Sequence, residues 1–162
     1  MAALATFCAL LLILSALHKA QARPRLTGTV GQLTGTGPVG AGLLLLIAGV
    51  IELFAGLALL VAPLRLVGAV AAVALWSGYA LALARRHGTA LDCGCDLAAR
   101  TRPVTLATIL RPVLLAAAAG LVALLPATAF TLETPFAAAG LLALYLGASE
   151  LLAIPRPHWR HA

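Results

Sequence analysis

The chain is poor in charge. Only 10% of its 162 residues are Asp, Glu, Lys or Arg, whereas 62% are hydrophobic. A typical soluble domain is roughly 25% charged and roughly 45–50% apolar. An aqueous fold could not bury this much apolar surface. The composition therefore excludes an ordinary soluble domain and indicates a protein that folds in lipid.

Aromatic residues are scarce as well, at 5% of the chain, and no basic face accompanies them. The formal charge of +6 therefore does not indicate nucleic-acid binding, which needs a basic surface or stacking platforms. The cations lie in short connections beside apolar segments, where they set membrane orientation and meet anionic lipid head groups. We expect the lipid bilayer as a partner and no nucleic acid.

Cofactor motifs are also missing. No sequence pattern typical of a quinone, flavin or haem site is present, and no paired C-x-x-C spacing marks a zinc site. No internal repeat is evident. We therefore expect no bound cofactor and assign no metal ligands.

Long apolar stretches are what the chain does have. A membrane-spanning helix needs roughly 20 residues, and five stretches reach or approach this length: about 2–17, 39–61, 64–84, 104–125 and 136–154. The first has no cationic leader, so we expect a retained helix and not a signal peptide. The predicted fold is all-α: one integral membrane domain over residues 1–162, with a four-helix core and a fifth C-terminal transmembrane helix.

Proline and glycine mark the connections between these stretches. Pro63 predicts a tight antiparallel hairpin. Residues 23–38 are rich in Gly, Thr and Pro and predict an ordered loop or a short interfacial segment. Pro103 is suited to the first turn of the fourth spanning helix.

The cationic residues are distributed unevenly between the two sides of the predicted bundle. Arg65 alone lies on one side. Nine lie on the other: Lys19, Arg23, Arg25, Arg85, Arg86, Arg100, Arg102, Arg156 and Arg160. We expect the protein in the cytoplasmic (inner) membrane. The positive-inside rule then places the connection 85–103 and the C-terminus on the cytoplasmic side.

Two of the three cysteines, Cys93 and Cys95, flank Gly94 in the connection 85–103. A disulfide between them would close a small ring, which glycine tolerates because it has no Cβ. Such a ring is generally strained, and strained, exposed disulfides are oxidising and readily exchanged. We therefore predict a redox pair. A metal site, with copper(I) favoured over zinc, and a structural role are the alternatives.

The third cysteine, Cys8, lies within the first apolar stretch. A buried cysteine usually packs as a small hydrophobic residue. The alternative is a thiol relay at mid-depth, which would require the connection to dip into the membrane.

Three charged residues lie within predicted spans, where each is costly and needs a partner. Glu52 is near the middle of the second span, Arg111 is in the fourth and Glu150 is near the end of the fifth. We predict that they form one intramembrane charge cluster that joins three helices. A proton or substrate pathway is the alternative.

The stretch Val50–Leu60, with its intramembrane Glu52 followed by Gly56, resembles the second helix of the DoxX/MauE superfamily. The Asp92–Cys95 segment, then Pro103 and Arg111 in the next helix, is similar to the MauE family of methylamine utilisation proteins. The resemblance covers about residues 4–125 and implies that the four-helix core is DoxX-like.

This resemblance implies a cytoplasmic-membrane protein that matures methylamine dehydrogenase. It implies that Cys93 and Cys95 are the redox pair and that Glu52 and Arg111 are signature intramembrane charges. It also implies a thioredoxin-like partner and, as client, the disulfide-rich small subunit of methylamine dehydrogenase.

The expected function is thus thiol–disulfide exchange in protein maturation, as a component of a thiol–disulfide oxidoreductase system. A second conventional cysteine pair is absent, which argues against a self-sufficient oxidase. The alternatives are a non-catalytic membrane assembly subunit and a small-solute or metal transporter that uses Glu52 and Arg111.

Overall fold

The computed structural model describes residues 1–91 and 102–152. Within these residues, five helices are long and apolar enough to cross a membrane. They are α1 (Ala2–Gln21), α3 (Pro38–Leu60), α4 (Arg65–Ala84), α5 (Leu106–Leu124) and α6 (Glu133–Leu152). This confirms the predicted all-α multi-pass bundle.

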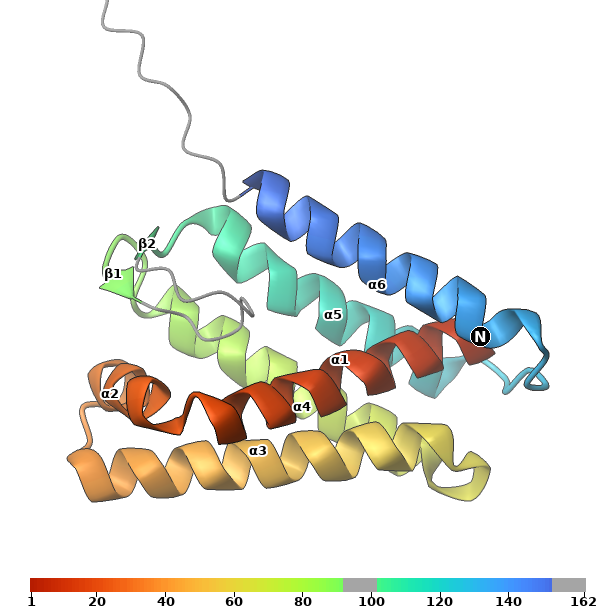
Figure 1. Cartoon of the computed structure of the whole chain (residues 1–162), viewed down its shortest axis with the longest axis horizontal. Helices are drawn as coiled ribbons and strands as arrows, with labels where there is room; N and C mark the ends of the chain where they lie inside the picture. The colour runs from red at the N-terminus through yellow and green to blue at the C-terminus, as the bar shows by residue number, and fades with distance from the viewer. Residues whose placement is uncertain (92–101, 153–162) are drawn as a thin grey trace, which may run out of the picture.

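Four of these helices form a core, and α6 lies against it (Figure 1). Helix α1 packs on α3, α3 packs on α4, and α4 packs on α5. Helix α6 lies mainly against α1, where the rings of Phe7 and Tyr145 meet edge to face with their centroids 6.1 Å apart. The fifth spanning helix is therefore attached to the core chiefly through the first.

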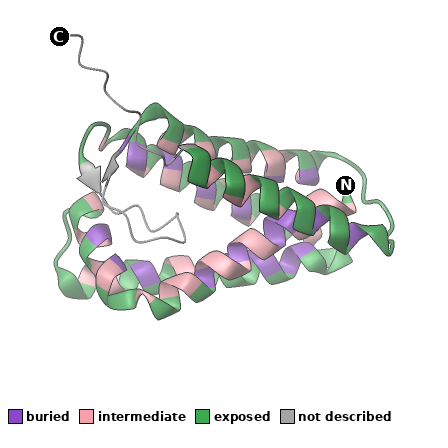
Figure 2. Cartoon of the chain, turned by 45° about the horizontal axis from the view of Figure 1, so that its top comes forward, coloured by how far each residue is buried: buried purple, intermediate pink, exposed green. Residues whose placement is uncertain are grey.

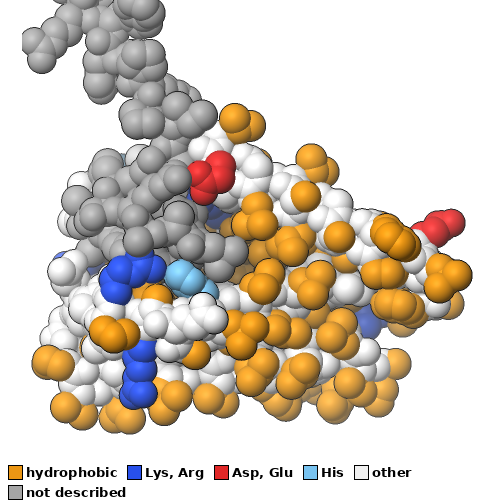
Figure 3. Space-filling view, in the orientation of Figure 1, with side chains coloured by type: hydrophobic (Ala, Val, Ile, Leu, Met, Phe, Trp, Pro, Cys, Tyr) orange, Lys and Arg blue, Asp and Glu red, His pale blue; other side chains and the backbone are white. Residues whose placement is uncertain are grey.

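The core is built largely from small residues. Cys8, Ala9, Ala55, Ala69 and Ala72 are all fully buried. Small side chains let helix backbones approach closely, and such packing drives helix association in lipid. The buried positions face inward in Figure 2, and hydrophobic side chains cover much of the outer face in Figure 3.

The hairpin between α3 and α4 is as tight as Pro63 predicts. A single 3-10 turn, η1 (Ala62–Leu64), joins the two helices. At Gly68, an added Cβ would lie 2.7 Å from the backbone nitrogen of Leu59 and 2.9 Å from the carbonyl oxygen of Ala55. Helices α3 and α4 therefore cross here at a distance that only glycine permits.

Residues 23–38 contain a helix, α2 (Arg23–Thr34), where the sequence predicted a loop or short interfacial segment. Pro24 stands in the first turn, where its missing N–H is not needed. Leu26 and Thr29 are buried, and the helix packs against α3. Gly35, with a φ of 73°, ends it in the left-handed conformation. Tertiary packing has overridden the low helix propensity of the Gly- and Thr-rich sequence.

Helix ends differ from the predicted bounds by a few residues. Helix α1 continues past 17 to Gln21. Helix α5 begins at Leu106 and not at 104, because Thr105 caps it by accepting a hydrogen bond from the backbone N–H of Thr108. Pro103 therefore precedes the helix and does not occupy its first turn; it lies in strand β2 (Arg102–Pro103).

Candidate functional site

The connection after α4 is closed by a short pair of strands. Strand β1 (Ala90–Leu91) pairs antiparallel with β2, with Ala90 opposite Pro103 and Leu91 opposite Arg102. Two backbone hydrogen bonds extend this pairing: Gly88 N–H donates to Val104 and Val104 N–H donates to Thr89, each over 2.9 Å. The segment 92–101 therefore leaves and re-enters the described structure at adjacent points.

Cys93 and Cys95, the predicted redox pair, lie within 92–101 and so outside the described residues. The geometry of their thiols, and their assignment as redox or metal-binding residues, stays a prediction. Within 1–91 and 102–152, no three His, Cys, Asp or Glu side chains come together in a group that could hold a metal ion.

The strand pair and α2 lie at the same end of the bundle (Figure 1). The guanidinium of Arg86, just beyond α4, donates to the carbonyl oxygen of Leu33 on α2 over 3.4 Å. Figure 3 shows cationic side chains at this end of the molecule. At the opposite end, Arg65 donates to the carbonyl oxygens of Val122 and Leu125 at the end of α5, over 2.7 and 3.1 Å.

A polar centre lies inside the bundle around Glu52 of α3, whose side chain is only 1% exposed. Three donors converge on its Oε1 atom. They are the ammonium of Lys19 at 2.6 Å, the hydroxyl of Tyr79 at 2.9 Å and the hydroxyl of Ser15 at 3.0 Å. Among the described residues, the second carboxylate oxygen, Oε2, has no hydrogen-bond partner.

The donors come from two neighbouring helices. Ser15 and Lys19 are one turn apart on α1, so they share a face, and Lys19 also donates to Ser15 over 2.8 Å. Tyr79 comes from α4, and its ring lies 5.3 Å from the Lys19 ammonium. The centre therefore joins α1, α3 and α4 through one carboxylate, and we call Ser15, Lys19, Glu52 and Tyr79 the Glu52 centre.

This arrangement differs from the predicted charge cluster. Glu52 forms an ion pair with Lys19, a residue that the predicted cluster did not include. Arg111 of α5 instead donates to the carbonyl oxygen of Ser149 on α6 over 3.1 Å. Ser149 is next to Glu150 in the chain, so Arg111 is directed towards the end of α6. The intramembrane charges thus serve two different helix contacts.

The sequence analysis did not identify Ser15, Lys19 or Tyr79 as members of the centre. It counted Lys19 only among the cations that set membrane orientation. The available signal was the Ser15–Lys19 spacing, which places a hydroxyl and a cation on one helical face four residues apart. Cys8, by contrast, is fully buried in the core among apolar side chains, as expected of a small hydrophobic residue.

Five apolar helices around a buried ion pair define a multi-pass helical membrane protein. The model of the family described as methylamine utilisation protein MauE matches residues 1–125, and the chain belongs to this family. Family and fold together indicate a membrane protein of methylamine utilisation. The match ends where α5 ends, so α6 lies beyond it. No match was found among curated proteins or among solved structures.

Proposed function

We propose that this protein supports thiol–disulfide exchange in protein maturation at the cytoplasmic membrane, with Cys93 and Cys95 as the redox pair. The partner is a thioredoxin-like protein, and the client is the small subunit of methylamine dehydrogenase. The observation that carries the proposal is a Cys-Gly-Cys sequence, in a MauE family member, between two strands that pair with each other.

The paired strands support the proposal because they fix where the cysteine segment starts and ends. Ten residues, 92–101, connect Leu91 to Arg102, which are partners in the strand register. A short segment with tethered ends loses less conformational freedom on meeting a partner than an open chain would. Strands β1 and β2, to which both ends of the segment are joined, lie at the end of the bundle that carries α2 and Arg86.

The exchange balances without any further reactant. A thiolate of the Cys93–Cys95 pair attacks the partner's disulfide, forms a mixed disulfide and displaces one partner thiolate. The second thiolate of the chain attacks the mixed disulfide, so the chain's pair becomes a disulfide and the partner a dithiol. Two electrons pass to the partner, and the two protons lost by the chain's thiols end on the partner's. The reverse sequence reduces the chain's pair again.

The charge distribution supports a cytoplasmic position for the cysteine segment, since the cationic end of a membrane protein usually faces the cytoplasm. On this proposal, a cytosolic thioredoxin-like protein exchanges with Cys93 and Cys95. Disulfides of an exported client form outside, so a cytoplasmic pair would have to act before export or pass electrons across the membrane.

The Glu52 centre contributes to this function by holding the helices in place. Its carboxylate is sealed between α1, α3 and α4. We assign it a positioning role: it fixes α4, from whose end the cysteine connection departs.

The test is thiol alkylation in intact cells with a mass-tagged maleimide, on the full chain carrying Cys8→Ala so that only Cys93 and Cys95 report. The proposal expects two added tags after reduction and none after mild oxidation. It expects protection from a membrane-impermeant reagent until the cells are permeabilised. Thiols that stay reduced under both conditions would contradict redox chemistry, and tagging by the impermeant reagent in intact cells would place the pair outside.

A maturation assay separates the exchange function from a non-catalytic assembly role. Cys93→Ser and Cys95→Ser should each stop the accumulation of oxidised client, while the chain remains in the membrane at its usual level. If a chain with both substitutions still supports maturation, the assembly role replaces the exchange role.

A further inference from the structure

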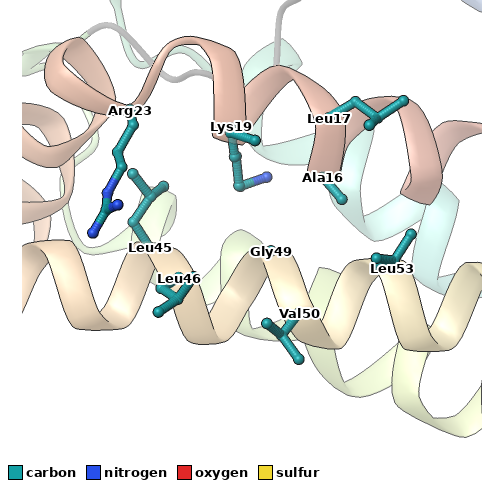
Figure 4. A pocket seen from close by; sticks show the side chains of 10 residues that line it. Ala16, Leu17, Lys19, Arg23, Leu45, Leu46, Gly49, Val50 and Leu53 are labelled. Atoms are coloured by element: carbon teal, nitrogen blue, oxygen red, sulfur yellow. The ribbon is translucent and has the colours of Figure 1, made fainter.

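A groove of about 220 Å³ runs between the last turns of α1 and the middle of α3 (Figure 4). Apolar side chains line most of it, including Leu46, Val50 and Leu53. These three are 53%, 59% and 42% exposed, so the groove faces the hydrocarbon of the membrane. Two cations, Lys19 and Arg23, are the only charged residues in its lining.

Of these two cations, Arg23 has no anionic partner among the described residues. Lys19 is already neutralised by Glu52 at 2.6 Å. Glu52 is the only acidic residue in the whole of α1, α2 and α3. Within the described part of the chain, no acidic side chain pairs with Arg23. The groove therefore keeps one net positive charge.

Arg23 is exposed and lies at one end of the apolar lining of the groove. Figure 4 shows the Arg23 side chain extending from the start of α2 towards α3, beside Leu45. Leu45 is two turns into α3, or roughly 10 Å from its beginning at 1.5 Å per residue. A cation beside an apolar helix surface is stabilised by an anion such as a lipid phosphate.

We propose that the groove binds one anionic phospholipid, with its phosphate on the Arg23 guanidinium and an acyl chain along α3. From Leu45 to Leu53 the groove extends for roughly 12 Å at 1.5 Å per residue. This is close to the roughly 15 Å thickness of one hydrocarbon leaflet. The negative phosphate of the lipid thus matches the positive charge of Arg23, and its acyl chain matches the length of the apolar lining. The inference does not depend on the thiol chemistry proposed above.

Gly49 offers a substitution that tests occupancy of the groove. An added Cβ at Gly49, which lines the groove, would meet no atom within 4 Å. Gly49→Leu therefore places an apolar side chain in the groove, and its Cβ contacts no neighbouring helix. Gly140 on α6 is equally open and lies outside the groove, so Gly140→Leu is its matched control. Arg85, exposed at the same end of the bundle and outside the groove, gives the matched charge control for Arg23.

The experiment is native mass spectrometry of the delipidated full chain, titrated with phosphatidylglycerol or phosphatidylcholine of the same acyl chains. We expect one phosphatidylglycerol to bind about fivefold more tightly than phosphatidylcholine, as expected for about 1 kcal/mol from one basic residue. Arg23→Gln should remove this preference, and Gly49→Leu should remove the bound lipid. Arg85→Gln and Gly140→Leu should behave as the unaltered chain, and circular dichroism should show equal helix content in all variants.

Equal binding of the two lipids by the unaltered chain would overturn the proposal. So would an equal effect of Arg23→Gln and Arg85→Gln, because that would indicate only the general attraction of a cationic surface. Retention of phosphatidylglycerol by Gly49→Leu would show that the lipid lies elsewhere. A dimer that Gly49→Leu dissociates would show that a second copy, and not a lipid, occupies the groove.

Discussion

The ammonium of Lys19 lies 2.6 Å from Oε1 of Glu52, and the two side chains are 10% and 1% exposed. This ion pair connects the last turn of α1 to the middle of α3. The hydroxyl of Tyr79 adds α4 to the same carboxylate. Three of the spanning helices thus share one buried acceptor, and their relative positions should depend on it.

Removing either partner of this pair should destabilise the bundle, but by different amounts. Lys19→Met leaves a buried carboxylate with no cation beside it and only the Tyr79 and Ser15 hydroxyls as donors, and we expect a loss of about 3–5 kcal/mol in the free energy of unfolding. Glu52→Gln should cost less, about 1–3 kcal/mol, because Lys19 lines an open groove and its ammonium has room to move away. Unfolding by SDS in mixed micelles measures both.

The double variant Lys19→Met/Glu52→Gln provides the control for this prediction. Since it leaves no unpaired charge, its cost should be well below the sum of the two single costs, which is the signature of coupled residues. Additive costs would contradict a direct ion pair. If the double variant is stable but maturation is lost, Glu52 has a role in function beyond positioning.

The close crossing of α3 and α4 makes a second prediction. Gly68→Ala places a Cβ 2.7 Å from the Leu59 nitrogen and 2.9 Å from the Ala55 carbonyl oxygen. Backbone atoms of a packed helix cannot move aside cheaply, so we expect a loss of about 1–3 kcal/mol. Gly78→Ala, on the same helix but with no atom within 4 Å of the new Cβ, should be neutral or stabilising by up to about 1 kcal/mol. Equal effects of the two substitutions in thermal unfolding would contradict the close approach.

Arg65 should stabilise the end of the bundle opposite α2. Its guanidinium donates to two carbonyl oxygens at the end of α5, those of Val122 and Leu125, where helical hydrogen bonding runs out. Arg65→Met should therefore cost about 1.5–3 kcal/mol, the usual range for hydrogen bonds to a charged group.

Arg85→Met is the control, because Arg85 is exposed and lies at the other end of α4. It should change the free energy of unfolding by less than about 0.5 kcal/mol. Hydrogen exchange of the last turn of α5 gives a local measurement, and protection that is unchanged in Arg65→Met would contradict the prediction.

The spanning helices could be predicted from sequence because the length of an apolar run is set by the thickness of the bilayer. The 12-residue helix α2 could not, since its Gly- and Thr-rich sequence has low helix propensity and its helical form depends on packing against α3. Local composition does not contain that contact.

Lys19 was not foreseen as a partner of Glu52 for a related reason. Depth along each helix was used to match Glu52 with Arg111, but depth does not say which helix faces which. The packing of α1 on α3 presents Lys19, 33 residues away in the chain, to the carboxylate. Arg111 is on α5 and is directed to α6. Rotation of the helices about their axes, which the sequence leaves open, decided the pairing.

Cys8 gives the last prediction, which concerns whether electrons pass through the membrane along cysteines. Its side chain is fully buried. Gln21 ends α1 on the side nearer the cysteine connection, and Cys8 lies roughly 20 Å from Gln21 at 1.5 Å per residue. Thiol exchange requires direct contact between sulfurs. We therefore expect Cys8→Ala to leave the alkylation pattern of Cys93 and Cys95 unchanged in growing cells, while Cys93→Ser changes it. If Cys8→Ala instead locks the pair in one redox state, and the bundle still unfolds at its usual SDS concentration, then Cys8 is a relay and α1 must move to bring it to the connection.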